Sequence, residues 1–422
     1  MNYPDSVRYL YSLGNELRTA KFGLETITAL LGALGHPERA CRFVHVAGTN
    51  GKGSTCAMLE SGLRAAGIRT GLYTSPHLDE PTERIQIGGH PVSQTQFAEA
   101  FDRVHQAAEG LIRDGALDYH PTYFETVTAM AFVLFQQLRA DKVVLEVGLG
   151  GRLDATNVVM PELSVITRVD FDHEAFLGRS IEAIASEKAG ILKPGIPAIL
   201  ASQRPEAAAT LRARAVAVDC PIIEASDWRV EDCILDLRGS RFTARRDREC
   251  AVQARCPLAG EHQVENAQTA IAALHALGVS REAIEAGIAE TRWPGRLELI
   301  SSRPEIILDG AHNPSGARAL VSYIQRFYVD RKITLIYGAM RDKAVVEMTA
   351  ILFPAADSVI VTAPNQERAT RPETIRDLGE RQDVRIAQSV AEALQWVKDA
   401  GPDEVVFVTG SLFMVAEARR LL

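Results

Sequence analysis

The stretch Phe43–Ser54, FVHVAGTNGKGS, decides the fold of this chain. It begins with a short apolar run that reads as a buried strand, and it then breaks into a loop with glycine at positions 48, 51 and 53. Ser54 is predicted to open a helix. Glycines let the backbone approach a ligand closely, and a helix start adds unpaired N–H groups and a partial positive charge. Together with Lys52, these features predict a site for a polyphosphate.

The loop departs from the usual phosphate-loop pattern G-x-x-x-x-G-K-[ST]. Val46 stands where the first glycine would be, and Gly53 stands where the hydroxyl residue would be, so the hydroxyl comes one residue late at Ser54. The competing interpretation is a tight strand-to-helix connection with a surface lysine. Because three glycines, a lysine and both flanking elements coincide, the sequence favours a nucleotide loop of a variant kind.

Length and composition indicate a globular protein with more than one core. The 422 residues exceed one ordinary core, so two domains are expected, and the contents of 46% apolar and 24% charged residues are typical of soluble proteins. The formal charge of −8 argues against broad nucleic-acid binding. Six cysteines without a C-x-x-C pair indicate free thiols in a reducing cytoplasm, and no signal peptide or membrane-spanning run is predicted.

Polar residues follow three further predicted strands, which span Thr70–Thr74, Lys142–Val147 and Leu163–Thr167. Open α/β sheets bind ligands at the carboxyl ends of their strands, so Ser75, Glu146 and His173 are candidate magnesium ligands. Ser75 could also be a turn serine, and His173 could be a hydrogen-bonded core histidine. For Glu146 a cation partner is favoured, because an acid in an apolar strand is costly unless it is paired.

The segments around these strands are predicted mainly as helices. Two helices are expected in residues 1–40, and two more in residues 93–140, with exposed aromatics of Tyr119–Glu125 between them that suit a flat ligand or core packing. Lys188 lies on a helix that Gly190 ends, and an ion pair is expected for it. Residues 196–257 are expected to alternate strand-like segments with polar turns.

A second α/β rhythm begins after Trp293–Arg296, which reads as a linker. Its strands are predicted at residues 306–308, 333–337, 358–362 and 405–408. The first of them ends in the polar run Asp309–Pro314, and a few cations, among them Lys343 and Arg368, give local basic character. The expected division is one domain at 1–295 and a second, α/β domain at 296–422. Such an arrangement suits a nucleotide on one domain and a co-substrate pressed against it by the other.

Eight motifs carry a resemblance to a known family. They are GTNGKGS (48–54), TSPHL (74–78), EVGLGGRLDATN (146–157), DH (172–173), SEKAGI (186–191), HQ-x-x-NA (262–267), PGR (294–296) and DGAHNP (309–314). The chain thereby resembles the folylpolyglutamate synthase/dihydrofolate synthase family, the folate branch of the Mur-type ATP-dependent amide ligases. The Mur peptidoglycan ligases share the loop but carry a UDP-sugar-binding domain before it. Because only 47 residues precede Gly48 here, the folate branch is the expectation.

The resemblance implies a fold and a reaction. The fold would be a P-loop nucleotide-binding domain with a parallel-rich central sheet of the Mur ligase central-domain type, plus a smaller Rossmann-like α/β C-terminal glutamate-ligase domain. ATP, as co-substrate with Mg²⁺, would convert a carboxylate of dihydropteroate or of a folate's terminal glutamate into an acyl phosphate, which the amine of L-glutamate displaces. A cytoplasmic monomer with small-molecule substrates, and with neither nucleic acid nor membrane as partner, is expected.

The resemblance also implies roles for residues that match the family's motifs. ATP would be bound by Gly48, Thr49, Asn50, Gly51, Lys52, Gly53, Ser54, Asn266, Arg296, Asp309 and His312. Metal ligands would be Ser75, Glu146, His173 and Lys188, the last as a carbamate that turns a repelling cation into an anionic oxygen ligand. The catalytic residues would be Lys52, Lys188 and His312. The pterin would be received by Phe22, Thr122, Phe124 and Asp154, with Phe124 stacking on it.

Two other classes of function stay open at this point. One is an ATP-dependent phosphotransferase, which would consume no amino acid, and the other is a nucleotide-binding regulator that has lost catalysis. Loss of Lys52, Glu146 or His173 would favour the regulator, and all three are present. Whether dihydropteroate, folates or both are the acceptors is left open, as is the preferred folate form and its glutamate chain length.

Overall fold

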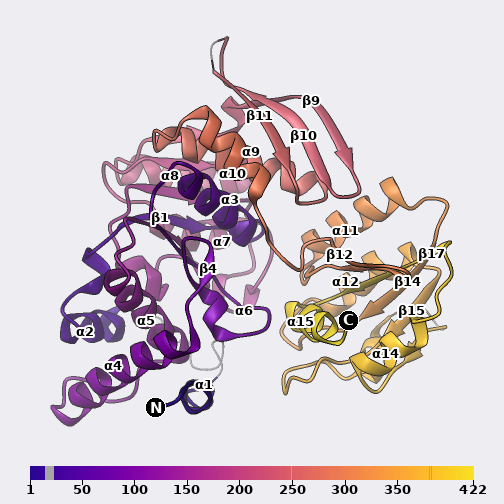
Figure 1. Cartoon of the computed structure of the whole chain (residues 1–422), viewed down its shortest axis with the longest axis horizontal. Coiled ribbons are helices and arrows are strands. Elements are labelled where there is room, and N and C mark those ends of the chain that lie inside the picture. Colours follow the sequence, from indigo (N-terminus) through magenta and orange to yellow (C-terminus); the bar gives the residue numbers. More distant parts are fainter. Residues whose placement is uncertain (15–22, 249, 380, 382) are drawn as a thin grey trace.

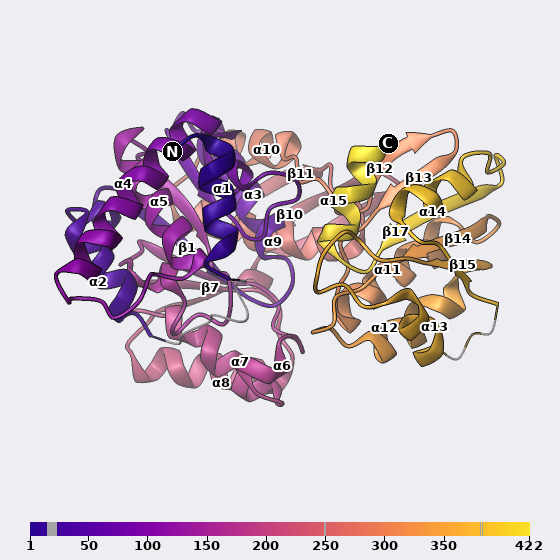
Figure 2. The ribbon, with the colours of Figure 1, turned by 90° about the horizontal axis from the view of Figure 1, so that it is seen from below.

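The fold is α/β, with a parallel-rich mixed sheet in each half of the chain. A computed structural model describes residues 1–14, 23–248, 250–379, 381 and 383–422. Figure 1 shows the N-terminal half and the C-terminal half side by side. A small three-stranded sheet lies at the top of the view, next to the helices of the N-terminal half. Figure 2 shows the same two bodies from below. We propose residues 1–295 and 296–422 as the two domains, because strands before and after that point join separate sheets.

The first sheet has eight strands in the order β4-β3-β2-β5-β1-β6-β7-β8. Its bounds are β1 Arg42–Ala47, β2 Thr70–Tyr73, β3 Ile85–Ile87, β4 His90–Pro91, β5 Lys142–Glu146, β6 Leu163–Ile166, β7 Ala198–Leu200 and β8 Ile222–Glu224. The six strands β2-β5-β1-β6-β7-β8 pair in parallel. The strands β3 and β4 add an antiparallel edge beside β2. The strands β1, β2, β5 and β6 confirm the four strands that the sequence predicts for the first sheet.

Helices cover both faces of this sheet. They are α1 Tyr3–Ser12, α2 Glu25–Ala33, α3 Lys52–Ala65, α4 Gln94–Arg113, α5 Tyr123–Gln137, α6 Glu174–Leu177, α7 Ile181–Lys188, α8 Pro205–Ala217, α9 Glu261–Ala276 and α10 Arg281–Glu290. Successive strand residues point to opposite faces. Val44 and Val46 of β1 pack in the cluster with α3, α9 and α10, whereas Phe43 packs in the cluster with α4 and α5.

The three-stranded sheet packs in the same cluster as α3, α9 and α10. Its order is β11-β10-β9, and its antiparallel strands are β9 Arg229–Asp236, β10 Gly239–Arg245 and β11 Ala251–Cys256. Its buried face contributes Phe242, Val252 and Ala254 to the same cluster as α9 and α10. Figure 1 shows this sheet standing beside α9 and α10 at the edge of the N-terminal half.

The C-terminal half contains a six-stranded sheet of order β12-β13-β17-β14-β15-β16. Its strands are β12 Glu298–Ser302, β13 Glu305–Leu308, β14 Lys332–Tyr337, β15 Ser358–Val361, β16 Arg385–Ile386 and β17 Glu404–Thr409, and its helices are α11 Pro314–Phe327, α12 Val345–Leu352, α13 Pro372–Leu378, α14 Val390–Val397 and α15 Leu412–Leu421. The four predicted strands are present as β13, β14, β15 and β17. The edge strands β12 and β16 were not predicted.

Three local expectations differ from the structure. The helix after the phosphate loop begins at Lys52 rather than Ser54. Residues 205–217, expected among strands and turns, form α8, which Pro205 starts and whose alanine-rich face is buried at Ala207, Leu211 and Ala215. Tyr123 is not exposed ahead of a helix, because α5 begins at that residue and buries it to 3% exposure, although Tyr119 remains 45% exposed.

Two further observations bear on the expected environment of the protein. All six cysteines are free. None of the helices that the structure describes combines the length and the apolar composition that a membrane span requires.

The packing of α3 against α10 depends on two facing glycines. A Cβ atom added to Gly287 would lie 2.3 Å from the Cα atom of Gly62, so one helix would have to shift. We expect G287A to lower stability by about 2 kcal/mol and the thermal unfolding midpoint by a few degrees. Gly401 is the control, because nothing lies within 4 Å of a Cβ atom there. An equal loss of stability in G401A, measured by scanning calorimetry, would contradict this account.

Candidate active site

The phosphate loop joins β1 to α3 as the sequence predicts, and its geometry requires glycine. Gly51 is the N-cap of α3 at φ 85°. A Cβ atom there would lie 2.2 Å from Oδ1 of Asn266 on α9. Lys52 curls over the loop, and its Nζ donates to the carbonyl oxygens of Gly48 at 3.1 Å and Thr49 at 3.2 Å. The loop backbone and the lysine cation are therefore gathered at the start of one helix.

A cavity of about 850 Å³ lies over this loop. It is lined by all of the residues expected to bind ATP, namely Gly48, Thr49, Asn50, Gly51, Lys52, Gly53, Ser54, Asn266, Arg296, Asp309 and His312. The same wall includes the four expected metal ligands, Ser75, Glu146, His173 and Lys188. Residues that are up to 264 positions apart are thus brought together between the two halves of the chain.

Side chains from α9 and from the end of β13 are fixed by hydrogen bonds. Asn266 donates to Oε1 of Gln263 at 3.0 Å, and Gln263 donates in turn to the Ser54 hydroxyl at 3.2 Å. Asp309 accepts from the N–H groups of Leu297 and Ala311, both at 3.0 Å. Gln263 was not among the predicted site residues. Its only signal in the sequence was its place in the motif around Asn266.

Lys188 ends α7 and is buried at 4% exposure. Its Nζ donates to the carbonyl oxygen of Gly48 at 2.8 Å. The expected ion pair is absent: no carboxylate within the described part of the chain lies at ion-pair distance from it. Burial, and then repulsion by Lys52, lowers the pKa of Lys188 to about 7, so a large fraction of this lysine is neutral near neutral pH.

Glu146 ends β5 and is buried at 4% exposure. One carboxylate oxygen accepts from the N–H of Ser75 at 3.1 Å, and no lysine or arginine of the described residues forms an ion pair with it. Burial raises its pKa to about 7, although the Lys52 charge and the Ser75 N–H act in the opposite direction. A buried carboxylate without an ion-pair partner among the described residues, in a cavity wall that also holds Ser75 and His173, fits a hard divalent cation.

The other candidate ligands do not amount to a preformed metal cage. Among the residues that the structure describes, no cluster of three or more histidine, cysteine or acidic side chains could hold a metal ion. The predicted set contains only two such residues, Glu146 and His173. The remaining ligands would have to be the Ser75 hydroxyl, a modified Lys188 and oxygen atoms of a bound phosphate. This composition suits a cation that arrives with a nucleotide.

His173 and its neighbour Asp172 mark the contact between the two halves of the chain. Nζ of Lys343 lies 2.7 Å from Oδ1 of Asp172 and 3.3 Å from Nε2 of His173. Oδ2 of Asp172 lies 3.3 Å from Nδ2 of Asn313 and 3.5 Å from Nε2 of His312. Burial opposes the ionisation of Asp172, but the His312 contact and the Lys343 charge hold its pKa well below the usual range. Asp172, Asn313 and Lys343 were not predicted as site residues.

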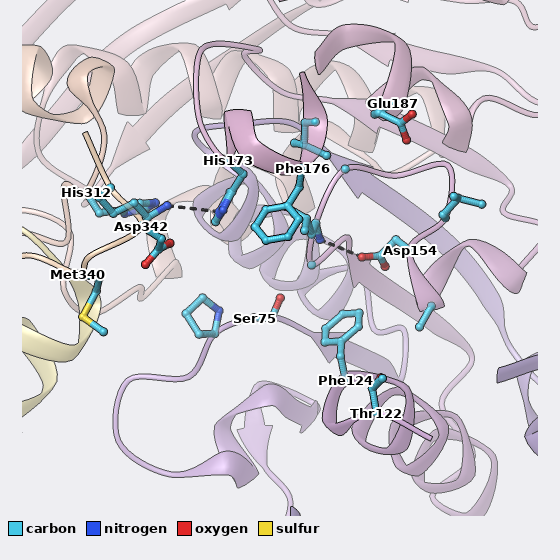
Figure 3. Close-up of a pocket in the computed structure, with 18 of the residues that line it drawn as sticks. Ser75, Thr122, Phe124, Asp154, His173, Phe176, Glu187, His312, Met340 and Asp342 are labelled. Atoms are coloured by element: carbon cyan, nitrogen blue, oxygen red, sulfur yellow. Dashed lines mark hydrogen bonds between the residues drawn. The ribbon is translucent and has the colours of Figure 1, made fainter. Parts of the chain in front are cut away.

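A second cavity, of about 440 Å³, adjoins the first. Thr122, Phe124 and Asp154 line it, whereas Phe22, the fourth residue expected to receive the pterin, lies outside the described residues. Figure 3 shows Thr122 and Phe124 on one side of this cavity and His173 and His312 on another. Ser75, His173 and His312 line both cavities, so they belong to the wall that the two have in common; its other members are Pro76, Gly148, Leu149, Gly150, Leu177 and Leu412.

Local hydrogen bonds hold the side chains of the second cavity. Thr122 is the N-cap of α5 and exchanges hydrogen bonds with Glu125. Asp154 accepts from the N–H groups of Leu149 at 2.9 Å and Thr156 at 3.0 Å, and from the Thr156 hydroxyl at 2.5 Å. Burial raises the pKa of Asp154, and these donors act against that rise. Asp154 is therefore rigidly oriented at the cavity wall.

Comparisons with known proteins agree with this geometry. Residues 46–274 match the model of the Mur ligase middle domain, and residues 295–412 match that of the Mur ligase glutamate ligase domain. The dihydrofolate synthase/folylpolyglutamate synthase of Bacillus subtilis (strain 168) is 35% identical over 413 residues, which are 95% of either chain. That of Escherichia coli (strain K12) is 34% identical over 420 residues, 96% of this chain and 92% of the relative.

Solved structures match over the whole chain. Folylpolyglutamate synthase of Mycobacterium tuberculosis, complexed with ADP and AMPPCP, has a TM-score of 0.92 at 33% identity, with 100% of this chain and 99% of that chain covered. FolC of E. coli, in complex with DHPP and ADP, has a TM-score of 0.87 at 32% identity, with 100% and 97% covered.

The raised pKa of Glu146 makes a testable statement about stability. Its pKa rises on folding from 4.5 to about 7, so folding takes up a proton in this window and stability is lost as the pH rises through it. In metal-free buffer we expect E146Q to be more stable than the wild type at pH 8, by about 3 kcal/mol. At pH 4, below the unfolded pKa, the two proteins should have similar stability. Thermal unfolding at both pH values checks this, and equal midpoints at pH 8 would contradict it.

Proposed function

This chain belongs to the Mur ligase family, in its folylpolyglutamate synthase/dihydrofolate synthase branch. It is an ATP-dependent ligase that joins glutamate to dihydropteroate or to a folate, and we propose how its residues divide this work. The observation that carries the proposal is the pair of adjoining cavities with a common wall at Ser75, His173 and His312. We assign the larger cavity to ATP and the smaller one to the acceptor, which is dihydropteroate, a folate's terminal glutamate, or both. The acceptor carboxylate then meets the γ-phosphoryl group at the common wall.

The reaction proceeds in two displacements. A carboxylate oxygen of the acceptor attacks the γ-phosphorus, the bond to ADP breaks, and an acyl phosphate forms. The amine nitrogen of L-glutamate then attacks the acyl carbon, the carbon–oxygen bond to phosphate breaks, and the nitrogen loses a proton. Amide, ADP and phosphate are the products. Positioning and charge stabilisation at the common wall are what the protein contributes to such a transfer.

The residues over the first cavity take the nucleotide roles. The backbone of Gly48–Ser54 cradles the phosphates, and Lys52 supplies a cation where negative charge accumulates. Its present hydrogen bonds to two loop carbonyls keep its Nζ at the loop until phosphate oxygens replace them. Asn266, Arg296, Asp309 and His312 contact the nucleotide from α9, the linker and the second domain. His312 also reaches the wall next to the acceptor cavity, which supports a catalytic role.

Mg²⁺ would be held by Ser75, Glu146, His173 and a carbamylated Lys188. When bound, it supplies charge neutralisation for the transferring phosphoryl group. The buried carboxylate of Glu146, which has no counter-ion in the described residues, supports this assignment. Ser75 and Glu146 are already adjacent through the hydrogen bond from the Ser75 N–H.

Lys188 has the properties that carbamylation requires. The reaction needs a neutral amine, whose nitrogen bonds to the carbon of CO₂ and then loses a proton to leave an anionic carbamate. Burial lowers the pKa of Lys188 to about 7, which supplies the neutral form near neutral pH. The carbamate would place a negative charge, which attracts Lys52, where the lysine cation would repel it. The pterin of the acceptor is proposed to stack on Phe124, between Thr122 and Asp154, with Phe22 as a further contact.

We also propose that the protein is a cytoplasmic monomer. Its six free cysteines support a reducing compartment.

The function is tested by ATP- and magnesium-dependent incorporation of labelled glutamate, with dihydropteroate and tetrahydrofolate as parallel acceptors. We expect incorporation with at least one of them, and K52A and E146A should each reduce it by at least about 10³-fold while the protein stays folded. Circular dichroism controls for folding. Near-normal ligation in either variant would remove the assigned role. Incorporation into neither acceptor by the wild type, with ATP bound, would favour a phosphotransferase or a regulator.

Carbamylation of Lys188 is tested by carbon-13 NMR. Protein equilibrated with ¹³C-bicarbonate at about pH 8 should show one carbamate signal that is missing in K188R. The arginine keeps the positive charge and cannot form a carbamate under these conditions. A carbamate signal that persists in K188R would come from another amine, and its complete lack in the wild type would mean that Lys188 is an unmodified amine.

A further inference from the structure

Lys343 lies in the loop between β14 and α12 of the second domain, and its ammonium is inserted into the first. Its side chain is only 11% exposed, and that of its partner Asp172 is 10% exposed. Nζ contacts two groups at once, Oδ1 of Asp172 at 2.7 Å and Nε2 of His173 at 3.3 Å. Figure 3 shows that His312 and Asp342, the residue before Lys343, approach His173 from the second domain.

The chemistry of this contact fixes the state of His173. An ammonium group is a donor only, so Nε2 must present its lone pair to Lys343. A metal ion bound by Nε2 would use the same lone pair, at about 2 Å. The lysine and the metal ion therefore exclude each other at this nitrogen.

We propose that Lys343 is a placeholder for the divalent cation: it occupies Nε2 of His173 in the metal-free protein and is displaced from it when the cation binds. The proposal rests on the assignment of His173 as a metal ligand. It adds one step to metal binding: Lys343, a side chain of the other domain, must leave Nε2 of His173 before the cation can bind there.

Asp172 determines what happens to the displaced lysine. Its carboxylate is held by the N–H of His173 at 2.9 Å and by Asn313 at 3.3 Å, independently of Lys343. Asp172 therefore retains Lys343 near the site after the contact between Lys343 and His173 is broken. The ammonium group then stays at the wall of the acceptor cavity, which Lys343 also lines. Loading of the metal and the arrangement of the two domains are thereby coupled.

The test measures binding of Mn²⁺ by electron paramagnetic resonance to protein saturated with ADP, without acceptor. We expect K343M to bind Mn²⁺ about tenfold more tightly than the wild type, because a competing cation has been removed from the ligand nitrogen. K332M is the matched control, since Lys332 is a 57% exposed lysine of the same domain. It should bind Mn²⁺ as the wild type does. Thermal unfolding confirms that each variant is folded.

A double variant separates competition at His173 from simple neutralisation of Asp172. D172N/K343M removes one charge of each sign and is expected to bind Mn²⁺ several-fold more tightly than the wild type. A return to the wild-type affinity would mean that Lys343 acts only through the charge of Asp172, and the proposal would be overturned. Unchanged or weaker binding in K343M would overturn it as well.

H173A distinguishes a failure of this inference from a failure of the metal assignment. Loss of Mn²⁺ binding in H173A, together with unchanged binding in K343M, rejects the placeholder and keeps His173 as a ligand. Undiminished binding in H173A rejects His173 as a ligand and the placeholder with it.

Discussion

The parallel pairing of β1 with β5 and β6, and of β2 with β5, is the constraint on which the site depends. Parallel strands end at one edge of a sheet, so whatever follows each of them is delivered to the same place. The phosphate loop follows β1, Ser75 follows β2, Glu146 ends β5, and Asp172 and His173 come after β6. The sheet itself is apolar and buried on both faces, which leaves this edge as the position where polar groups can gather without disrupting a core.

Burial dominates the electrostatics of this edge. Burial raises the pKa of Glu146 to about 7 and lowers that of Lys188 to about 7, so both groups are pulled toward neutrality. Neither forms an ion pair in the described part of the chain. Isolated buried charges are costly, and a bound cation would favour the ionised form of Glu146. The same burial that is unfavourable in the free protein strengthens every interaction with a phosphate or a metal once water is excluded.

The sequence could place the groups that follow strands, because strand ends can be recognised from apolar runs. Ser75, Glu146, His173 and the phosphate loop were found in this way, and the structure brings them to one cavity. Asn266, Arg296, Asp309 and His312 line the same cavity, but only a family resemblance could indicate them, since no local pattern relates α9 or the second domain to the loop. The roles of Asp172, Asn313 and Lys343 depend on how two domains meet, which local periodicity does not encode. Helix α8 was missed because its buried face is mostly alanine, which gives weak contrast between apolar and polar positions.

The polar contacts between the domains are strongest inside the site itself. Two of the outer ones, Arg326 with Glu261 and Arg420 with Asp79, join exposed side chains and contribute little to the free energy of docking. The inner contacts are buried: Lys343 meets Asp172 there, and Asn313 meets Asn50 of the phosphate loop at 2.9 Å. A ligand that binds at the loop or at His173 must therefore act on the same groups that hold the domains together. Because such coupling is reciprocal, the arrangement of the domains also sets the affinity for that ligand.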